Sequence, residues 1–173
     1  MSTHHRAPQT HDTLAAVEQL LGARLVALAD EWHAHDAATA TGDAVLGGLD
    51  LPELLASLVL SGGKRFRPVM CHWGWVAAGG SARGADPSTM VQVAAALELL
   101  HAVGLAQDDV MDRSEVRRGR PTMHVLAAGQ HRDAGGTDDA DRFGESIAVL
   151  VGDLGHAEAD ALVAGMPAAV RRL

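Results

Sequence analysis

Apolar residues recur at every third or fourth position along most of the chain, a spacing that places them on one face of an α-helix. The first such run covers about 12–40, where Leu14, Val17, Leu21, Leu25 and Leu28 share one face. The same pattern predicts further helices at about 49–60, 69–76, 87–108, 123–126 and 138–154. Helices are therefore expected to account for most of the chain.

One of these predicted helices differs from the others. The run at 87–108 begins after Asp86, with Pro87 at the first position, and this pair is typical of a helix start. The run is rich in alanine and apolar almost all round, which indicates a buried central helix rather than a surface one. For the chain as a whole we expect a disordered tail over 1–12 and one helical domain over 13–173.

Composition narrows the class of protein. With 173 residues, 47% of them apolar, the chain is long enough to bury a substantial core. The formal net charge of −8 argues against a nucleic-acid partner, which needs a basic surface. A single cysteine, Cys71, fits a reducing compartment. No apolar stretch approaches the length of a transmembrane span and the polar start lacks a secretion signal, so we expect a cytoplasmic protein.

Acidic side chains gather in the segment 101–124, which reads HAVGLAQDDVMDRSEVRRGRPTMH. On a helix, His101, Asp108 and Asp112 point the same way, and Asp109 lies about 100° round from Asp108. Carboxylates placed so closely repel one another unless a hard cation neutralises them. Mg²⁺ is the usual cation, because it takes oxygen ligands and bridges to phosphates.

Basic side chains follow the acidic ones within a few residues, at Arg117, Arg118 and Arg120. A guanidinium group suits the phosphate oxygens that a bound metal leaves uncovered. The alternative is a solvated helix end with Asp and Arg at ion-pair spacing, and a DDxxD pattern alone favours that alternative.

A second basic segment, SGGKRFRP at 61–68, lies between two predicted helices. Its two glycines allow the backbone to turn sharply near a ligand, and Lys64, Arg65 and Arg67 supply positive charge. The segment lacks the Ser or Thr after the lysine that a nucleotide P-loop needs. It is either an anion-binding turn or a basic connection between helices.

Four segments in order, GGKRFRP, HAVGLAQDDVMD, RRGRPTMH and RFGESIAVLVGDL, resemble the trans-isoprenyl diphosphate synthases. This polyprenyl synthetase family includes farnesyl and geranylgeranyl diphosphate synthases, and the resemblance covers roughly residues 49–163. It implies an all-α, isoprenoid-synthase-type helical bundle of which the chain is the N-terminal half only. The implied reaction elongates an allylic diphosphate with isopentenyl diphosphate and releases pyrophosphate.

The resemblance also implies roles for individual residues. Asp108 and Asp112 resemble the family's Mg²⁺ ligands, with Asp109 supporting them, and Arg117 resembles the residue that holds the allylic diphosphate. The positions that bind the diphosphate of isopentenyl diphosphate in the family are occupied here by Lys64, Arg67, His101 and Arg118. This chemistry is consistent, because ionising the allylic carbon–oxygen bond requires the pyrophosphate charge to be neutralised.

Product length in the family depends on how far the growing tail can descend beside the first aspartate helix. Above the aspartates this chain has Val103, Gly104 and Leu105, with no aromatic side chain. We expect room for geranylgeranyl or longer tails, unless another helix or a partner subunit supplies the floor of the pocket.

A second acidic cluster, at Asp138, Asp139 and Asp141, is interpreted as a helix cap rather than a second metal site. Complete family members are considerably longer and carry a second aspartate-rich motif in their C-terminal half. This chain is therefore expected to be a weak catalyst or none by itself. Three interpretations remain: the chain is part of a split synthase whose partner chain supplies that motif, an inactive truncated fragment, or a noncatalytic regulatory subunit. The apolar surface that a half-cavity would expose favours association with another chain, including a second copy in a homo-oligomer.

Overall fold

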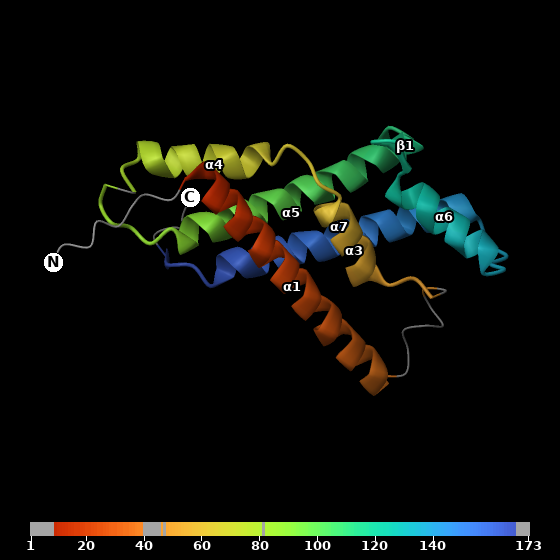
Figure 1. Cartoon of the computed structure of the whole chain (residues 1–173). Helices are drawn as coiled ribbons and strands as arrows, with labels where there is room; N and C mark the ends of the chain where they lie inside the picture. Colours follow the sequence, from red (N-terminus) through yellow and green to blue (C-terminus); the bar gives the residue numbers. More distant parts are fainter. Residues whose placement is uncertain (1–8, 40–45, 47, 81, 169–173) are drawn as a thin grey trace.

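The computed structural model of the chain describes residues 9–39, 46, 48–80 and 82–168, and most of these residues are helical (Figure 1). In chain order the elements are α1 (Thr10–Thr39), α3 (Leu51–Leu60), α4 (Phe66–Ala77), α5 (Ser88–Met111), β1 (Val116–Arg117), β2 (Arg120–Pro121), α6 (Met123–Asp133) and α7 (Ala140–Ala164). Strands within the described residues are limited to the short hairpin of β1 and β2. The all-α class expected from the sequence is confirmed.

Helix α5 is central, as its apolar composition predicts. It packs along α7 over most of its length and also contacts α1, α3, α4 and α6 (Figure 1). Ala94, Ala95, Ala102 and Ala106 of α5 are all buried. Their small side chains allow neighbouring helices to approach α5 closely, so its carboxyl end is held rigidly against the rest of the fold.

Glycines of α7 complete this close packing. A Cβ atom added at Gly155 would lie 2.9 Å from Cγ2 of Val103 on α5 and 3.0 Å from Cδ1 of Leu55 on α3. Distances of this kind leave no room for a side chain, because interiors are packed to crystal-like density. Gly155 is therefore the point where three helices meet.

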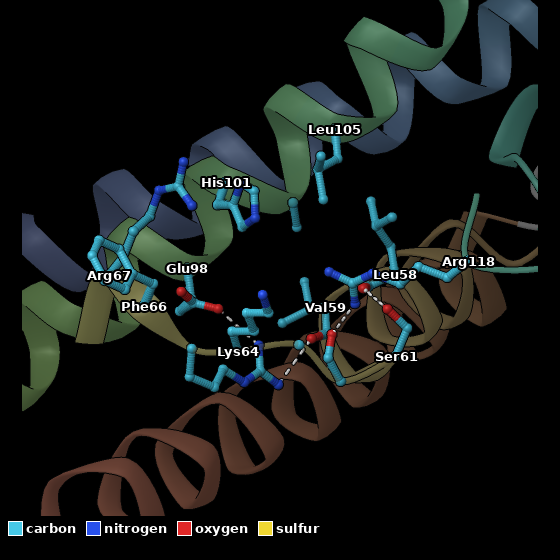
Figure 2. Close-up of a pocket in the computed structure, with 14 residues that line it drawn as sticks. Leu58, Val59, Ser61, Lys64, Phe66, Arg67, Glu98, His101, Leu105 and Arg118 are labelled. Atoms are coloured by element: carbon cyan, nitrogen blue, oxygen red, sulfur yellow. Dashed lines mark hydrogen bonds and ion pairs between the residues drawn. The ribbon is translucent and has the colours of Figure 1, made fainter. Parts of the chain in front are cut away.

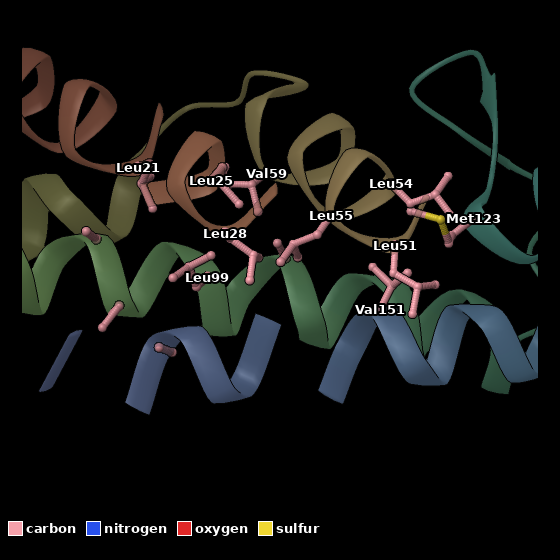
Figure 3. Close-up of a cluster of buried hydrophobic side chains, with 14 of the residues drawn as sticks. Leu21, Leu25, Leu28, Leu51, Leu54, Leu55, Val59, Leu99, Met123 and Val151 are labelled. Carbon is pink, nitrogen blue, oxygen red and sulfur yellow. The ribbon is translucent and has the colours of Figure 1, made fainter. Parts of the chain in front are cut away.

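Leucine, valine, isoleucine and alanine side chains, contributed mainly by α1, α3, α5 and α7, form the core (Figure 3). Leu21 of α1, Leu55 of α3, Leu99 of α5 and Val151 of α7 are at most 1% exposed. They belong to the apolar faces that the helical spacing predicts, and their burial supplies the main driving force for folding. The core lies where α1 and α3 pack against α5 and α7 (Figure 3).

Helix α5 contradicts the expectation that no apolar stretch approaches the length of a transmembrane span. By length and composition alone it is apolar enough to cross a bilayer, so the statement that no stretch approaches that length is wrong. Half of its apolar window is buried inside the structure. Because the core helix of a soluble protein meets the same criterion, this finding is weak evidence for a membrane span.

Helix boundaries follow local chemistry. Asp50 caps α3 by accepting a hydrogen bond from the Glu53 backbone N–H at 2.9 Å. Asp139 caps α7 by accepting from the backbone N–H groups of Asp141 and Arg142, both at 3.1 Å. The interpretation of the second acidic cluster as a helix cap is thereby confirmed.

Two boundaries differ from the sequence-based expectation. Helix α1 already begins at Thr10, inside the expected disordered tail. Residues 1–8 of that tail and 169–173 of the expected domain lie outside the described residues. Helix α6 continues to Asp133 instead of ending near Leu126. Its packing along α7 outweighs the cost of about 1 kcal/mol that a glycine such as Gly129 imposes on a helix.

Candidate functional site

A cavity of about 550 Å³ opens between the end of α3, the segment 61–65, the start of α4 and the middle of α5. Its lining includes Lys64, Arg67, His101 and Arg118, which come from the segment after α3, from α4, from α5 and from the hairpin turn (Figure 2). These are the four residues that the family resemblance assigns to one diphosphate. The fold brings all of them to one concave surface.

Glycine residues let the backbone enter this cavity. Gly62 has a φ of 82°, a conformation that side chains rarely adopt. A Cβ atom at Gly63 would lie 3.3 Å from Nη2 of Arg118. The Arg118 guanidinium donates a hydrogen bond to the Gly62 carbonyl, so the two-glycine turn and the hairpin hold each other at the cavity mouth.

The hairpin turn orients two neighbouring arginines in different directions. Arg118 and Gly119 have φ values of 53° and 76°, as in a two-residue turn of type I′. Arg117 pairs with Arg120 across the strands, and Arg118 lies at the tip. The tip reaches the cavity through Arg118, whereas Arg117 turns back toward the end of α5.

His101 lies half-buried in the cavity wall. Burial lowers its pKa from the ordinary value, the positive charges of Arg67, Arg118 and Arg117 lower the pKa further, and Glu98 opposes them. The imidazole is therefore neutral at neutral pH. It presents one N–H donor and one acceptor nitrogen among cationic neighbours.

The three aspartates at the end of α5 divide into two kinds. Asp108 and Asp112 are exposed, whereas Asp109 is only 3% exposed. Asp109 accepts hydrogen bonds from Arg117, with Oδ1 lying 2.9 Å from Nε and 2.7 Å from Nη2. This contact raises the pKa of Arg117, which stays fully charged.

These positions bear on the predicted metal site. In the part of the chain that the structure describes, no three His, Cys, Asp or Glu side chains are arranged to hold a metal ion. Asp109 is turned inward onto Arg117, whereas Asp108 and Asp112 face outward. Asp108 and Asp112 remain as two exposed carboxylates one helical turn apart, a donor pair that suits a hard cation sharing its other ligands with water and phosphate.

A shallow groove of about 280 Å³ continues from the cavity along α5. Leu97, Leu100, Gly104 and Asp108 line it at helical spacing, and it shares Arg67, His101 and Leu105 with the cavity. No heavy atom lies within 4 Å of a Cβ built at Gly104. The groove therefore joins Asp108 to the cavity, with a wall formed by Leu97, Leu100 and Leu105 and without a Phe, Tyr or Trp side chain.

The family model described as Polyprenyl synthetase matches residues 50–172 of the chain. The chain belongs to the polyprenyl synthetase family. The helical-bundle class predicted from the resemblance is confirmed by a solved structure, the geranylgeranyl pyrophosphate synthase of Corynebacterium glutamicum complexed with isoprenyl diphosphate and magnesium. The two superpose with a TM-score of 0.70 and 31% sequence identity, over 88% of this chain and 42% of that one.

Curated members of the polyprenyl synthetase family give the same picture. A short chain isoprenyl diphosphate synthase of Methanothermobacter thermautotrophicus is 38% identical over 97 residues, which are 56% of this chain and 23% of that protein. The geranylgeranyl diphosphate synthase of Saccharolobus solfataricus is 35% identical over 109 residues, 63% of this chain and 26% of that protein. The matched segment thus spans about a quarter of these relatives.

The sequence did not single out Glu98 of this polyprenyl synthetase cavity, and for Arg65 it indicated only a positive charge in the turn, without a partner. Both residues line the cavity: Glu98 of α5 is buried, and Arg65 lies immediately before α4. The available signal was Glu98 itself, the one charged residue between Ser88 and Gln107 in an otherwise apolar run. A buried carboxylate requires a partner, but spacing alone does not identify which cation supplies it.

Proposed function

We propose that the chain is the diphosphate-binding half of a prenyltransferase that condenses an allylic diphosphate with isopentenyl diphosphate. One observation carries the proposal: Lys64, Arg67, His101 and Arg118 converge on one cavity, and a groove joins that cavity to Asp108. Two substrates, each with a diphosphate and an apolar tail, match a basic cavity beside an acidic helix end. The reaction joins the tails and releases pyrophosphate.

In this proposal the cavity binds the diphosphate of isopentenyl diphosphate. Lys64, Arg67 and Arg118 supply cationic donors, and hydrogen bonds to charged groups contribute about 1.5–3 kcal/mol each. His101 donates its N–H group to the same diphosphate. Fixing this substrate beside the groove holds its double bond near the allylic carbon, which converts a bimolecular step into an intramolecular one.

Mg²⁺ is the proposed cofactor, and Asp108 and Asp112 are the residues that would hold it. Bound there, the metal supplies charge neutralisation for the departing pyrophosphate. Asp109 fits a supporting role better than a ligand role, since its carboxylate already binds Arg117. By holding the guanidinium, Asp109 orients Arg117 toward the allylic diphosphate.

The groove along α5 is the proposed path of the allylic tail. Leu97 and Leu100 provide an apolar surface, and Gly104 leaves space just above the aspartates. Once the groove is covered, these leucine side chains would also help to exclude water, which would otherwise trap the allylic cation. An open path of this kind supports a geranylgeranyl or longer product.

We further propose that a second polypeptide segment covers this groove and brings the second aspartate-rich motif. An apolar stripe on α4 supports this idea, since Phe66, Met70 and Trp73 are 65%, 58% and 56% exposed. Leu97 and Leu100 of α5, the helix against which α4 packs, are also partly exposed. Large exposed apolar surface is a mark of an interaction site. The segment belongs either to a partner chain or to the remainder of a longer protein.

The cytoplasm is the proposed location. Burial raises the pKa of the Cys71 thiol, which favours the unreactive protonated form. A single, partly buried thiol is consistent with a reducing compartment.

The diphosphate cavity can be tested by calorimetric titration of the chain with inorganic pyrophosphate and Mg²⁺. We expect Lys64→Gln and Arg67→Gln each to weaken binding about 10- to 100-fold, the equivalent of one charged hydrogen bond. Arg142→Gln is a matched control, because Arg142 is exposed on α7, far along the chain from the cavity residues. Equal binding by all three variants would remove the basis of the proposal.

The proposed covering segment can be tested by complementation. The chain would be co-expressed with the part of the Corynebacterium glutamicum synthase that it does not match, and condensation of labelled isopentenyl diphosphate would be measured. A split synthase is active only in the mixture, and Asp108→Asn abolishes that activity. A noncatalytic regulatory subunit instead alters the products of a full-length synthase and tolerates Asp108→Asn, and an inactive fragment does neither.

A further inference from the structure

A negative charge lies in the wall of the cavity that we propose for an anion. Glu98 is 5% exposed and sits one helical turn before His101 on α5 (Figure 2). Lys64, Arg67 and Arg118 line the same cavity. An uncompensated buried carboxylate at this point would repel a diphosphate and weaken the field of the three cations.

Arg65 compensates Glu98. Its Nη1 atom lies 2.9 Å from Oε2 of Glu98, and its Nη2 donates to the Val59 carbonyl at 3.2 Å. Its Nε lies 3.5 Å from Oε1 of Glu18 on α1. One buried guanidinium thus joins α1, α3 and α5.

The backbone of Arg65 adopts a conformation that non-glycine residues rarely take. Its φ and ψ are 45° and 40°, in the left-handed helical region, immediately before the first residue of α4. Such a conformation persists only where surrounding contacts hold it. The contacts to Glu98 and the Val59 carbonyl hold the Arg65 side chain inward at this position, between Lys64 and Arg67 in the sequence.

We propose that Arg65 is a positioning residue that neutralises Glu98 in the cavity wall and so preserves the positive charge presented by Lys64, Arg67 and Arg118, without binding the diphosphate itself. The inference rests on the proposed function, since it concerns the same cavity. Lys64 and Arg67 flank Arg65 in the sequence and line the cavity (Figure 2). Arg65 also lines it, but its side chain is only 11% exposed and its Nη1 donates to Glu98. The cavity consequently keeps the charge of its three remaining cations.

A double-mutant cycle on Arg65 and Glu98 separates this role from direct binding. Pyrophosphate affinity is measured for Arg65→Gln, Glu98→Gln and the double variant. We expect Arg65→Gln to bind about 10- to 100-fold more weakly, because Glu98 is left unpaired in the cavity wall. Glu98→Gln and the double variant should bind within about threefold of the parent chain.

A second measurement reports the charge of the cavity without any ligand. The pKa of His101 is followed by NMR, with His101→Gln assigning the resonance. Because Glu98 raises the pKa of His101, an unpaired Glu98 in Arg65→Gln should raise that pKa further, and the double variant should reverse the rise. A purely structural role for Arg65 would leave no such reversal.

The outcomes distinguish the two proposals. If the parent chain binds pyrophosphate but the double variant is as weak as Arg65→Gln, then Arg65 is a ligand or a structural residue, and the inference is overturned. If the parent chain does not bind pyrophosphate, the proposed function fails first, while the His101 titration still decides whether Arg65 neutralises Glu98. Should Arg65→Gln not fold, the double variant decides alone, because replacing both members of a buried pair is often neutral for stability.

Discussion

Arg117 donates hydrogen bonds from Nε and Nη2 to Oδ1 of Asp109, at 2.9 and 2.7 Å. This pair ties the hairpin to the end of α5 and separates Asp109 from its neighbours Asp108 and Asp112. Of the three aspartates, one therefore belongs to the scaffold of the site, and two face solvent. Substitutions of the buried aspartate and of the exposed aspartates should therefore affect stability differently.

Replacing Asp109 should cost stability, whereas replacing Asp108 should not. Asp109→Asn leaves Arg117 without its carboxylate, and we expect the free energy of unfolding to fall by about 1–3 kcal/mol, a range reduced for the partial exposure of Arg117. Asp108→Asn alters an exposed side chain and should change it by less than about 0.5 kcal/mol. Urea unfolding measures both, and equal effects would show that the inward turn of Asp109 is not structural.

A second pair predicts a pH dependence of stability. Nε2 of His33 lies 2.5 Å from Oδ2 of Asp50, which also caps α3, and this hydrogen bond raises the pKa of His33. A raised pKa means that the folded state favours the imidazolium. The stabilisation is therefore complete below the ordinary pKa of about 6.5 and is lost as pH rises through the raised pKa.

The expected result is a pH-dependent difference between the parent chain and His33→Gln. The parent should have the higher urea midpoint at about pH 6, and the difference between the two midpoints should disappear by about pH 9. His156→Gln, at an exposed histidine of α7, serves as the control. A difference that stays constant across this range would mean that protonation of His33 does not contribute.

Packing at Gly155 predicts an asymmetry between two glycine substitutions. Gly155→Ala places a Cβ against Val103 and Leu55, and overpacking of this kind destabilises by about 1–3 kcal/mol. Gly22→Ala on α1 meets no heavy atom within 4 Å and should stabilise by up to about 1 kcal/mol through helix propensity. Thermal unfolding of the two variants measures the difference, and a stabilising Gly155→Ala would contradict the close approach of α3, α5 and α7.

The open groove predicts an effect on product length. In an active assembly, Gly104→Phe should shorten the main product, because the new ring fills the space beside Leu100 and Asp108. Val149→Phe adds a ring at a partly exposed position of α7 that does not line the groove, and it should leave the products unchanged. Chromatography of the dephosphorylated products measures both. An unchanged distribution for Gly104→Phe would place the tail elsewhere.

Helical spacing was sufficient to predict much of the fold. Leu21, Leu25 and Leu28 of α1 are buried as their periodicity requires, and Asp139 caps α7 as its position before an apolar run indicates. The grouping of Lys64, Arg67, His101 and Arg118 came from the family resemblance. The local sequence pattern does not specify this grouping, because the connections between the helices decide where the four side chains meet.

Contacts between distant segments account for what the sequence did not reveal. The position of Asp109, about 100° round the helix from Asp108, is visible in the sequence, but its pairing with Arg117 depends on the turn at Arg118 and Gly119. The Arg65 partner of Glu98 likewise depends on a left-handed residue that propensity argues against. Tertiary contacts thus override local preference at the site itself.

The chain contains a single lysine, so the central claim has a direct test. Lys64 is modified with an amine-directed reagent in the presence and absence of inorganic pyrophosphate and Mg²⁺, and the modified peptide is quantified by mass spectrometry with the N-terminal amine as internal reference. We expect pyrophosphate to protect Lys64 but not the N-terminus, and Arg67→Gln to diminish that protection. Equal modification of Lys64 with and without pyrophosphate would contradict the assignment of this cavity to a diphosphate.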